Sequence, residues 1–354
     1  MRIAQIAPLW ASVPPSHYGG TEAIVHLLTE ELVRRGHEVT LFASGDSRTD
    51  GRLRPACDVN LIDAMARGEA WTYEGYANAN LVEALREAES FDIIHCHLGC
   101  RAIPIGTLSR TPIFHRINSA LTPDDLWILS RYPDVPIIAQ THSQIASVPP
   151  ARRQNIRIIY NGVNVNAYEP SYLPGKYLAF LGRMSPLKNP LGAIQIAGKA
   201  SLPIVLAGAP ENLEEEDYFS AHIRPRIDGK HVTYIGRVAH AQKNELLKNA
   251  AALLFPIEWE EPFGNVMVEA MACGTPVLAC NRGAVSEVID YGKTGFYGDS
   301  PESVASFVPR TLELDRAAIR AHAQKRFSHI RMVDQYLQTY EDFTGIAASL
   351  ACSA

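Results

Sequence analysis

Three short stretches at the start of the chain decide its fold: Arg-Ile-Ala-Gln-Ile-Ala at residues 2–7, Ala-Ile-Val-His-Leu-Leu-Thr-Glu-Glu-Leu at residues 23–32, and Glu-Val-Thr-Leu-Phe at residues 38–42. The first and third are apolar runs of strand length. In the second, apolar side chains recur with the period of a helix, which ends at Gly36. A strand, a helix and a second strand in this order predict a βαβ unit with parallel strands.

The same alternation continues to the end of the chain, which predicts an α/β protein whose parallel sheets are covered by helices on both faces. A length of 354 residues is too much for one typical core, and turn residues interrupt the pattern at 161–175, where we place a domain boundary. The further strands are expected at residues 92–97, 112–117, 136–141, 156–160, 177–181, 204–207, 231–235, 252–255, 276–279 and 295–297.

Composition excludes several classes of function. A formal net charge of −5 argues against nucleic acid as a partner, because binding the phosphate backbone needs a basic face. No apolar run reaches the roughly 18 residues of a membrane span, so we expect no integral membrane segment. Residues 1–8 are typical of a first strand rather than a signal peptide, and the six cysteines are scattered. Both features indicate reduced thiols and a cytoplasmic protein.

Residues 261–269 read Glu-Pro-Phe-Gly-Asn-Val-Met-Val-Glu and precede an apolar helical run. If a helix begins near Gly264, Glu261 lies in the loop before it and Glu269 lies on its second turn. The start of a helix carries free N–H groups and partial positive charge, which suit phosphate or sugar oxygens. Taken alone, the spacing fits equally well an ordinary amphipathic helix with one loop acid and one solvated acid.

Two further motifs follow expected strands. Gly19 and Gly20 stand between the first strand and the first helix, where a backbone without side chains can approach a phosphate closely. Arg183 and Lys188 follow the strand at 177–181, and two cations there can stabilise a departing diphosphate. The alternatives are a flexible turn for the glycines and plain surface charge for the cations.

Histidines give two more candidates. His115 lies near the end of an expected strand and is either a ligand-binding side chain or a structural one. The segment around His95, Cys96 and His97 has the composition of a metal site. Alternate strand residues point to opposite faces, however, so Cys96 opposes the two histidines and four ligands do not converge. We therefore predict no metal site.

Together these motifs resemble the retaining glycosyltransferases of family 4, and the resemblance runs through nearly the whole chain. It implies the GT-B fold, with two Rossmann-like domains facing across a cleft at residues 1–165 and 166–328 and a C-terminal helix, about 329–354, that returns to the first domain. Besides Gly19-Gly20 and 261–269, the segments that carry it are Gly182-Arg183-Met184-Ser185-Pro186-Leu187-Lys188, Gly274-Thr275-Pro276-Val277, Arg282-Gly283-Ala284-Val285-Ser286-Glu287 and Thr294-Gly295-Phe296.

The resemblance also implies residue roles. Arg183 and Lys188 would stabilise the departing diphosphate in place of a metal ion, while Glu261 and His115 would position the transferred sugar. The other implied contacts with the donor are made by Gly19 and Gly20 at the diphosphate, by backbone groups of Phe263, Gly264 and Asn265 at the sugar, by Glu269 at the ribose, and by the turn that ends at Val238 near the base.

The implied activity is metal-independent and cofactor-independent transfer of a hexose of the glucose type from a nucleotide-sugar, most often a UDP-sugar in this family, with retention of configuration. The acceptor would be a hydroxyl of a sugar, glycan or lipid-linked molecule, as in polysaccharide biosynthesis. Two alternatives stay open on the same fold: a nucleotide-sugar 2-epimerase and a non-catalytic protein that binds sugar nucleotides. Trp71, Tyr73 and Tyr76 are either an acceptor-stacking surface or part of the core.

Overall fold

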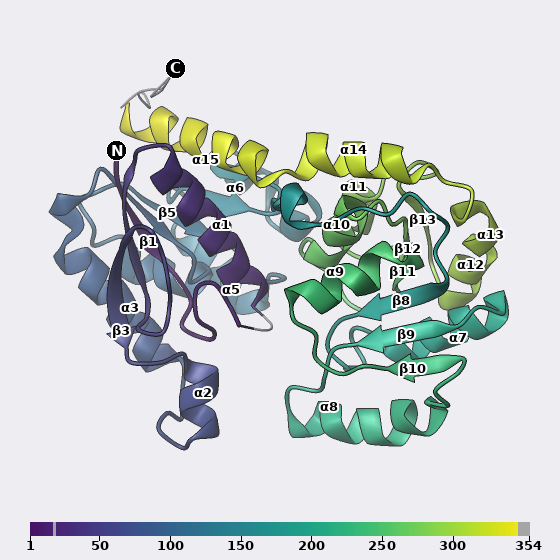
Figure 1. Cartoon of the computed structure of the whole chain (residues 1–354). Helices are drawn as coiled ribbons and strands as arrows, with labels where there is room; N and C mark the ends of the chain where they lie inside the picture. The colour runs from purple at the N-terminus through teal and green to yellow at the C-terminus, as the bar shows by residue number, and fades with distance from the viewer. Residues whose placement is uncertain (17–18, 346–354) are drawn as a thin grey trace. The chain divides into compact units, whose positions relative to one another are not determined.

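The computed structural model describes residues 1–16 and 19–345 and divides the chain into two compact units. The first unit comprises residues 1–162 together with the C-terminal segment from His329, and the second comprises Val163–Ser328. Each unit contains one sheet, and strands alternate with helices along the chain in both (Figure 1). All strand pairs are parallel, which confirms the predicted pair of Rossmann-like domains.

The first unit has a seven-stranded sheet in the order β3-β2-β1-β4-β5-β6-β7. Six of its strands lie where the alternating pattern predicts them. The elements are β1 (Arg2–Ile6), α1 (Gly20–Arg34), β2 (Glu38–Ser44), β3 (Arg52–Cys57), α2 (Leu61–Ala66), α3 (Glu74–Arg86), β4 (Ile93–Cys96), α4 (Ile103–Gly106), β5 (Ile113–Arg116), α5 (Pro123–Arg131), β6 (Ile137–Ala139), α6 (Pro150–Arg153), β7 (Ile156–Ile158) and α15 (His329–Thr344).

The strand β3 has no counterpart among the strands expected from the sequence. Its sequence, Arg-Leu-Arg-Pro-Ala-Cys, carries two charges and a proline and has no apolar run. Such a strand is tolerated at the edge of a sheet, and β3 pairs only with β2 there. The apolar pattern missed β3 because this strand has no apolar run, and its strand conformation depends on its pairing with β2.

One core cluster of the first unit lies between the sheet and the helices α1 and α15, which lie side by side (Figure 1). The apolar stripe of α15 consists of Val333, Tyr336, Leu337 and Tyr340, which are all buried. Phe343 completes the pattern in sequence but remains 44% exposed. Helix α15 thereby belongs to the first unit although it is last in the chain.

The second unit has a six-stranded sheet in the order β10-β9-β8-β11-β12-β13, and all six strands lie where the sequence predicts them. The elements are β8 (Tyr177–Leu181), α7 (Pro190–Ala200), β9 (Ile204–Ala207), α8 (Leu213–Tyr218), β10 (Val232–Tyr234), α9 (His240–Lys248), β11 (Ala250–Phe255), α10 (Asn265–Ala272), β12 (Val277–Cys280), α11 (Val285–Val288), β13 (Gly295–Gly298), α12 (Pro301–Ser306), α13 (Val308–Thr311) and α14 (Arg316–Phe327).

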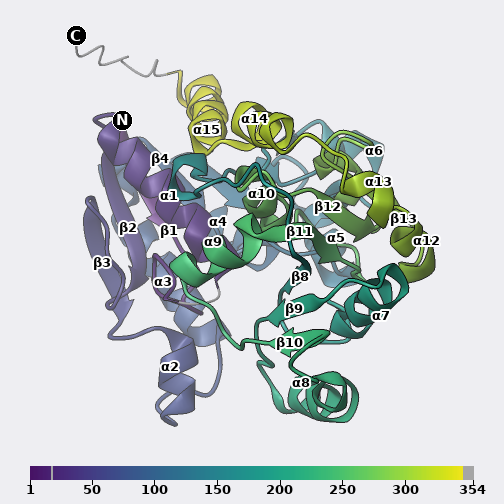
Figure 2. The same ribbon diagram turned by 45° about the vertical axis from the view of Figure 1, so that its right-hand side comes forward.

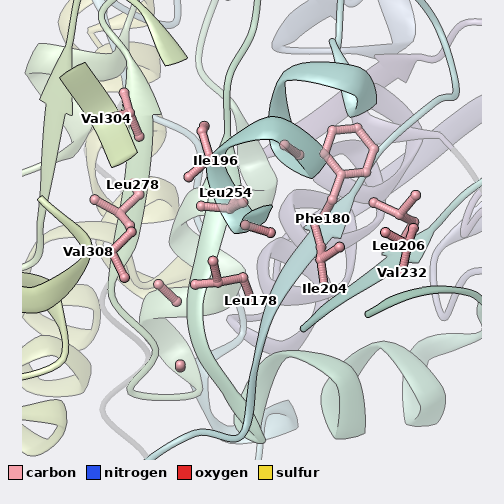
Figure 3. Close-up of a cluster of buried hydrophobic side chains, with 14 of the residues drawn as sticks. Leu178, Phe180, Ile196, Ile204, Leu206, Val232, Leu254, Leu278, Val304 and Val308 are labelled. Atoms are coloured by element: carbon pink, nitrogen blue, oxygen red, sulfur yellow. The ribbon is translucent and has the colours of Figure 1, made fainter. Parts of the chain in front are cut away.

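One core cluster of the second unit contains side chains from all six strands and from the helices that cover one face, and Figure 3 shows part of it. Leu178, Leu254 and Leu278 come from β8, β11 and β12, and Ile196 and Val304 come from α7 and α12. These two helices also pack against each other, as both ribbon views show (Figure 1, Figure 2). Among the described residues, no helix combines the length and the apolar character that crossing a membrane requires.

Candidate functional site

The sheet of the second unit has a topological switch point between β8 and β11. The chain runs outward in one direction through β8, β9 and β10 and in the other through β11, β12 and β13. Open parallel sheets bind ligands at such a point, beyond the carboxyl ends of the strands, because the loops there turn away from each other. Arg183 follows β8 directly, and Glu261 lies in the loop that joins β11 to α10. The structure therefore brings the predicted cations and acids to this end of the sheet.

Lys188 and Glu261 form a nearly buried ion pair. The Lys188 ammonium lies 2.5 Å from Glu261 Oε2, and the two side chains are 12% and 11% exposed. Trp259 Nε1 donates to the same carboxylate oxygen at 3.0 Å, and its ring centre lies 4.9 Å from the Lys188 ammonium. The predicted cation Lys188 and the predicted acid Glu261 are therefore paired with each other. An anionic ligand that binds Lys188 would have to replace Glu261.

The backbone of Glu261 is held by a turn far along the chain. Gly283 has a φ of +57°, and a Cβ built there would lie 2.3 Å from the Glu261 carbonyl oxygen and 2.4 Å from its nitrogen. The next residue, Ala284, donates its N–H to that carbonyl at 2.8 Å. Only glycine allows this approach, so the segment Arg282-Gly283-Ala284 fixes where Glu261 stands.

Replacing Gly283 by alanine is expected to destabilise the second unit by more than the conformational penalty alone. Gly292 is a matched control, because its φ is +78° and the nearest atom to an added Cβ is 3.9 Å away. Gly292→Ala should cost about 1–2 kcal/mol for the left-handed backbone. Gly283→Ala should cost at least about twice that in urea unfolding, since the Glu261 backbone must also move. Equal losses in the two variants would contradict the proposed clamp.

Glu269 lies on the second turn of α10, as predicted. The helix begins at Asn265 after Gly264, whose φ of +82° reverses the chain into it. Glu269 Oε1 accepts two hydrogen bonds, from the Tyr168 hydroxyl at 2.9 Å and from the Lys243 ammonium at 2.5 Å. The Glu269 side chain is 19% exposed. One oxygen of this carboxylate is therefore committed to two donors within the protein.

Arg183 is paired with acids that the sequence analysis did not single out. Its Nη1 lies 2.7 Å from Glu215 Oε1, and its Nε lies 3.9 Å from Glu211 Oε2. Burial raises the pKa of Glu211, and the nearby Arg183 and Arg237 oppose that rise. The acidic run at 214–217 lies in the first turn of α8, and Glu215 in it is only 6% exposed. No local signal could show which acid of the run turns inward.

The remaining predicted contacts of the second unit line the same end of the sheet. Phe263 is 1% exposed and packs edge-on against Phe327 at 5.9 Å between ring centres. Asn265 begins α10, and Val238 is half-buried in the turn after β10. The backbone of that turn is joined to the loop after β9, where Gly208 N–H donates to Gly236 O at 2.8 Å.

The glycine pair opens the first helix of the first unit. Gly19 is the residue before α1 and caps it without a side chain, and a Cβ there would meet Pro15 Cβ at 2.6 Å. Residues 17–18 of this loop lie outside the described residues. Just inside the helix, Glu22 is 4% exposed and accepts the Ala11 N–H at 3.4 Å. Burial raises the pKa of Glu22 to about 7, which makes it a further titratable group at this loop.

His115 is buried in this structure, and its contact with the transferred sugar stays a prediction. The residue lies within β5 and is 1% exposed, so in this structure it offers no surface to a ligand. Its ring faces α4, where a Cβ on Gly106 would lie 2.5 Å from Nε2. Neither ring nitrogen has a hydrogen-bond partner among the described residues, and burial lowers the pKa of His115 to about 3.

The paired histidines of β4 are core residues. His95 and His97 share a face, with ring centres 3.9 Å apart, and both are fully buried. His95 Nδ1 contacts the Tyr340 hydroxyl at 2.7 Å and His97 Nε2 contacts Gln5 Oε1 at 2.6 Å. Within residues 1–16 and 19–345, no three His, Cys, Asp or Glu side chains are grouped in a way that could hold a metal ion.

The aromatic residues of region 44–80 divide between surface and core. Trp71 is 89% exposed. Tyr73 and Tyr76 pack against a small apolar cluster that includes Leu9, and Tyr73 also stacks on Trp10 with ring centres 4.6 Å apart. Tyr73 and Tyr76 therefore belong to the core, and an acceptor-stacking role for Trp71 stays a prediction.

Two sequence families match the chain. Residues 168–325 match Glycosyl transferases group 1, and residues 18–167 match Glycosyltransferase Family 4. Relatives include the D-inositol 3-phosphate glycosyltransferase of Mycolicibacterium smegmatis, which is 26% identical over 91% of this chain and 86% of its own length. Spore coat protein SA of Bacillus subtilis is 24% identical over 96% of this chain and 99% of its own length.

Solved structures share the fold. Sucrose-phosphate synthase from Thermosynechococcus elongatus superposes with a TM-score of 0.75 at 19% identity, covering 97% of this chain and 99% of that one. HepE from Anabaena, in complex with UDP and glucose, gives 0.72 at 19% identity, covering 96% and 99%. The two family matches together extend from residue 18 to residue 325, and the protein therefore belongs to the glycosyltransferases, with a family 4 segment followed by a group 1 segment.

Proposed function

We propose that the protein transfers a hexose from a UDP-linked donor to an acceptor hydroxyl, with retention of configuration and without a metal ion. The observation that carries the proposal is the Lys188–Glu261 pair at the switch point of the second sheet, 2.5 Å between charged atoms and nearly buried. HepE, which has been solved with UDP and with UDP-glucose on the same fold, supports UDP as the nucleotide. The acceptor is proposed to be a sugar or polyol hydroxyl.

In the proposed reaction, the bond between the anomeric carbon and the β-phosphate oxygen breaks, and its electron pair leaves with the diphosphate. Lys188 and Arg183 would exchange their carboxylate partners for phosphate oxygens and stabilise the negative charge that accumulates there. The acceptor oxygen bonds to the anomeric carbon on the face that the diphosphate leaves. The proton of the acceptor hydroxyl passes to the departing phosphate oxygen, so charge and atoms balance.

The acids would bind the two ends of the donor. Glu261, released from Lys188, would accept hydroxyls of the transferred sugar, because a carboxylate accepts several hydroxyl hydrogen bonds at once. Backbone N–H groups at the start of α10 would face the same sugar. Glu269, on the second turn of α10, would accept the ribose hydroxyls. Because His115 is buried, the proposal gives it no contact with the donor.

Calorimetric titration of UDP, GDP and ADP in the presence of EDTA tests the donor class and the metal independence together. Wild-type protein is expected to bind UDP most tightly, and Glu269→Ala should weaken UDP by about tenfold to hundredfold, since a hydrogen bond to a charged group contributes about 1.5–3 kcal/mol. Glu287→Ala, which removes an acid from the neighbouring α11, serves as the control. Equal affinity for the three nucleotides, or UDP binding only with added Mg²⁺, would contradict the proposal.

Product analysis separates transfer from the epimerase alternative. UDP-glucose incubated with the protein and a pool of sugar acceptors should release UDP and yield a product that retains the anomeric configuration. Conversion of the donor sugar without any acceptor would instead favour epimerisation.

A further inference from the structure

The carboxylate of Glu269 is held from one side only. Tyr168 and Lys243 both donate to Oε1, and no hydrogen bond to Oε2 is present among the described residues. The three side chains come from separate segments: Tyr168 from the turn after residues 165–167, Lys243 from α9 and Glu269 from α10. A carboxylate oxygen has two lone-pair positions, so Oε2 can accept two hydroxyls.

Tyr168 is held in place by its surroundings and donates a hydrogen bond from its hydroxyl to Glu269. It is 5% exposed, and its backbone carbonyl accepts Arg320 Nη1 at 2.9 Å. Its ring makes an edge-to-face contact with His240, with ring centres 4.9 Å apart, and His240 Nε2 contacts Ala167 O at 2.9 Å. Burial and the neighbouring Glu269 raise the pKa of Tyr168 far above the working range. Its hydroxyl therefore keeps its proton and always donates to Glu269.

Lys243 supplies the charge. Its ammonium lies 2.5 Å from Glu269 Oε1 and 5.6 Å from the centre of the Tyr168 ring, so the cation is close to both the acid and the aromatic ring. Two donors on one oxygen restrict the rotation of the carboxyl group. A positive partner also offsets the cost of a half-buried carboxylate. The second oxygen is thereby oriented before any ligand arrives.

We propose that Tyr168 and Lys243 are positioning residues that aim Glu269 Oε2 at a vicinal diol, and so make the protein selective for ribonucleotide over deoxyribonucleotide donors. The proposal rests on the proposed function, in which Glu269 binds the ribose. Preorganisation of this kind strengthens binding because the acid does not have to be ordered by the ligand. Neither residue needs to touch the donor.

The test compares the affinity of UDP with that of 2′,3′-dideoxy-UDP, measured by calorimetry in EDTA. Wild-type protein should prefer UDP by at least about tenfold. Tyr168→Phe, which removes one oxygen atom, and Lys243→Met should each reduce that preference to less than about threefold. Lys248→Met is the matched control, because Lys248 lies on the same helix and pairs with Glu169 and Glu245 but not with Glu269. It should keep the wild-type preference.

The ratio of the two affinities distinguishes positioning from general damage. A variant that is merely less well folded loses affinity for both nucleotides alike. An unchanged ratio in Tyr168→Phe and Lys243→Met would overturn the positioning inference but not the proposed function. If wild-type protein binds UDP and dideoxy-UDP equally, the ribose role of Glu269 fails with it. If wild-type protein binds neither nucleotide, the proposed function itself is overturned.

Discussion

Lys188→Ala is expected to lower the turnover of the nucleotide-sugar by about 10²–10³-fold, the usual loss when one group that stabilises developing negative charge is removed. Lys188 lies at the switch point of the second sheet, where its ammonium pairs with Glu261 and lies 4.9 Å from the Trp259 ring centre and 5.7 Å from the Phe255 ring centre. Alanine has no ammonium group, so it cannot stabilise the negative charge on the departing diphosphate. Steady-state kinetics at saturating donor measure the loss, and the affinity for UDP should fall as well.

The design of this experiment must account for the acid left behind. Removing one member of a nearly buried ion pair leaves an uncompensated charge and destabilises the fold. The double variant Lys188→Met with Glu261→Gln removes that charge and should restore the thermal unfolding temperature but not turnover. Lys199→Ala, which removes an exposed lysine paired with Glu302, should leave both unchanged. A folded Lys188→Ala protein with turnover within twofold of wild type would exclude the assigned role.

Glu22→Gln is expected to change the pH dependence of stability by about 3 kcal/mol. Burial raises the pKa of Glu22 to about 7 in the folded protein, against 4.5 for an ordinary glutamate. The folded state therefore binds the proton more tightly than the unfolded state does. The stabilisation is fully present below pH 4.5, falls as the pH rises and is lost above pH 7. Glutamine cannot ionise, so the variant should not show this fall.

The measurement is urea unfolding of wild type and Glu22→Gln at pH 5 and pH 8. The difference in the free energy of unfolding between the two proteins should shift by about 2.5 kcal/mol in favour of the variant between pH 5 and pH 8. Glu83→Gln controls for net charge, because Glu83 is an exposed acid on α3 that pairs with Arg86. A pH-independent difference between wild type and Glu22→Gln would show that the carboxyl is already ionised at pH 5.

Local patterns were enough to predict most of the fold. Twelve of the thirteen strands follow from apolar runs between helical segments, because a strand buried on both faces of a parallel sheet must be apolar throughout its length. The exception, β3 at Arg52–Cys57, is an edge strand that owes its state to its partner β2. The position of Glu269 on the second turn of α10 also followed from the sequence, since Gly264 marks where the helix begins.

The burial and the partners of each site residue depend on tertiary contacts, which local sequence patterns do not show. Glu215 is one of four consecutive acids, and only the packing of α8 beside the loop after β8 turns it towards Arg183. His115 had the residue type expected of a sugar ligand, yet the pleat of β5 directs it into the core against α4. In both cases the outcome depends on which face of an element meets a neighbour.

The sequence by itself determined the alternation of strands and helices, the residue types at the switch point and the start of α10, because these depend on periodicity and turn chemistry within a few residues. Only the tertiary structure decided the partners: Lys188 with Glu261, and Tyr168 and Lys243 with Glu269, across 73, 101 and 26 residues of chain. Such partners are chosen by how the sheet brings its loops together. Ion pairs and hydrogen bonds depend on distances of a few ångströms, which the order of residues does not contain.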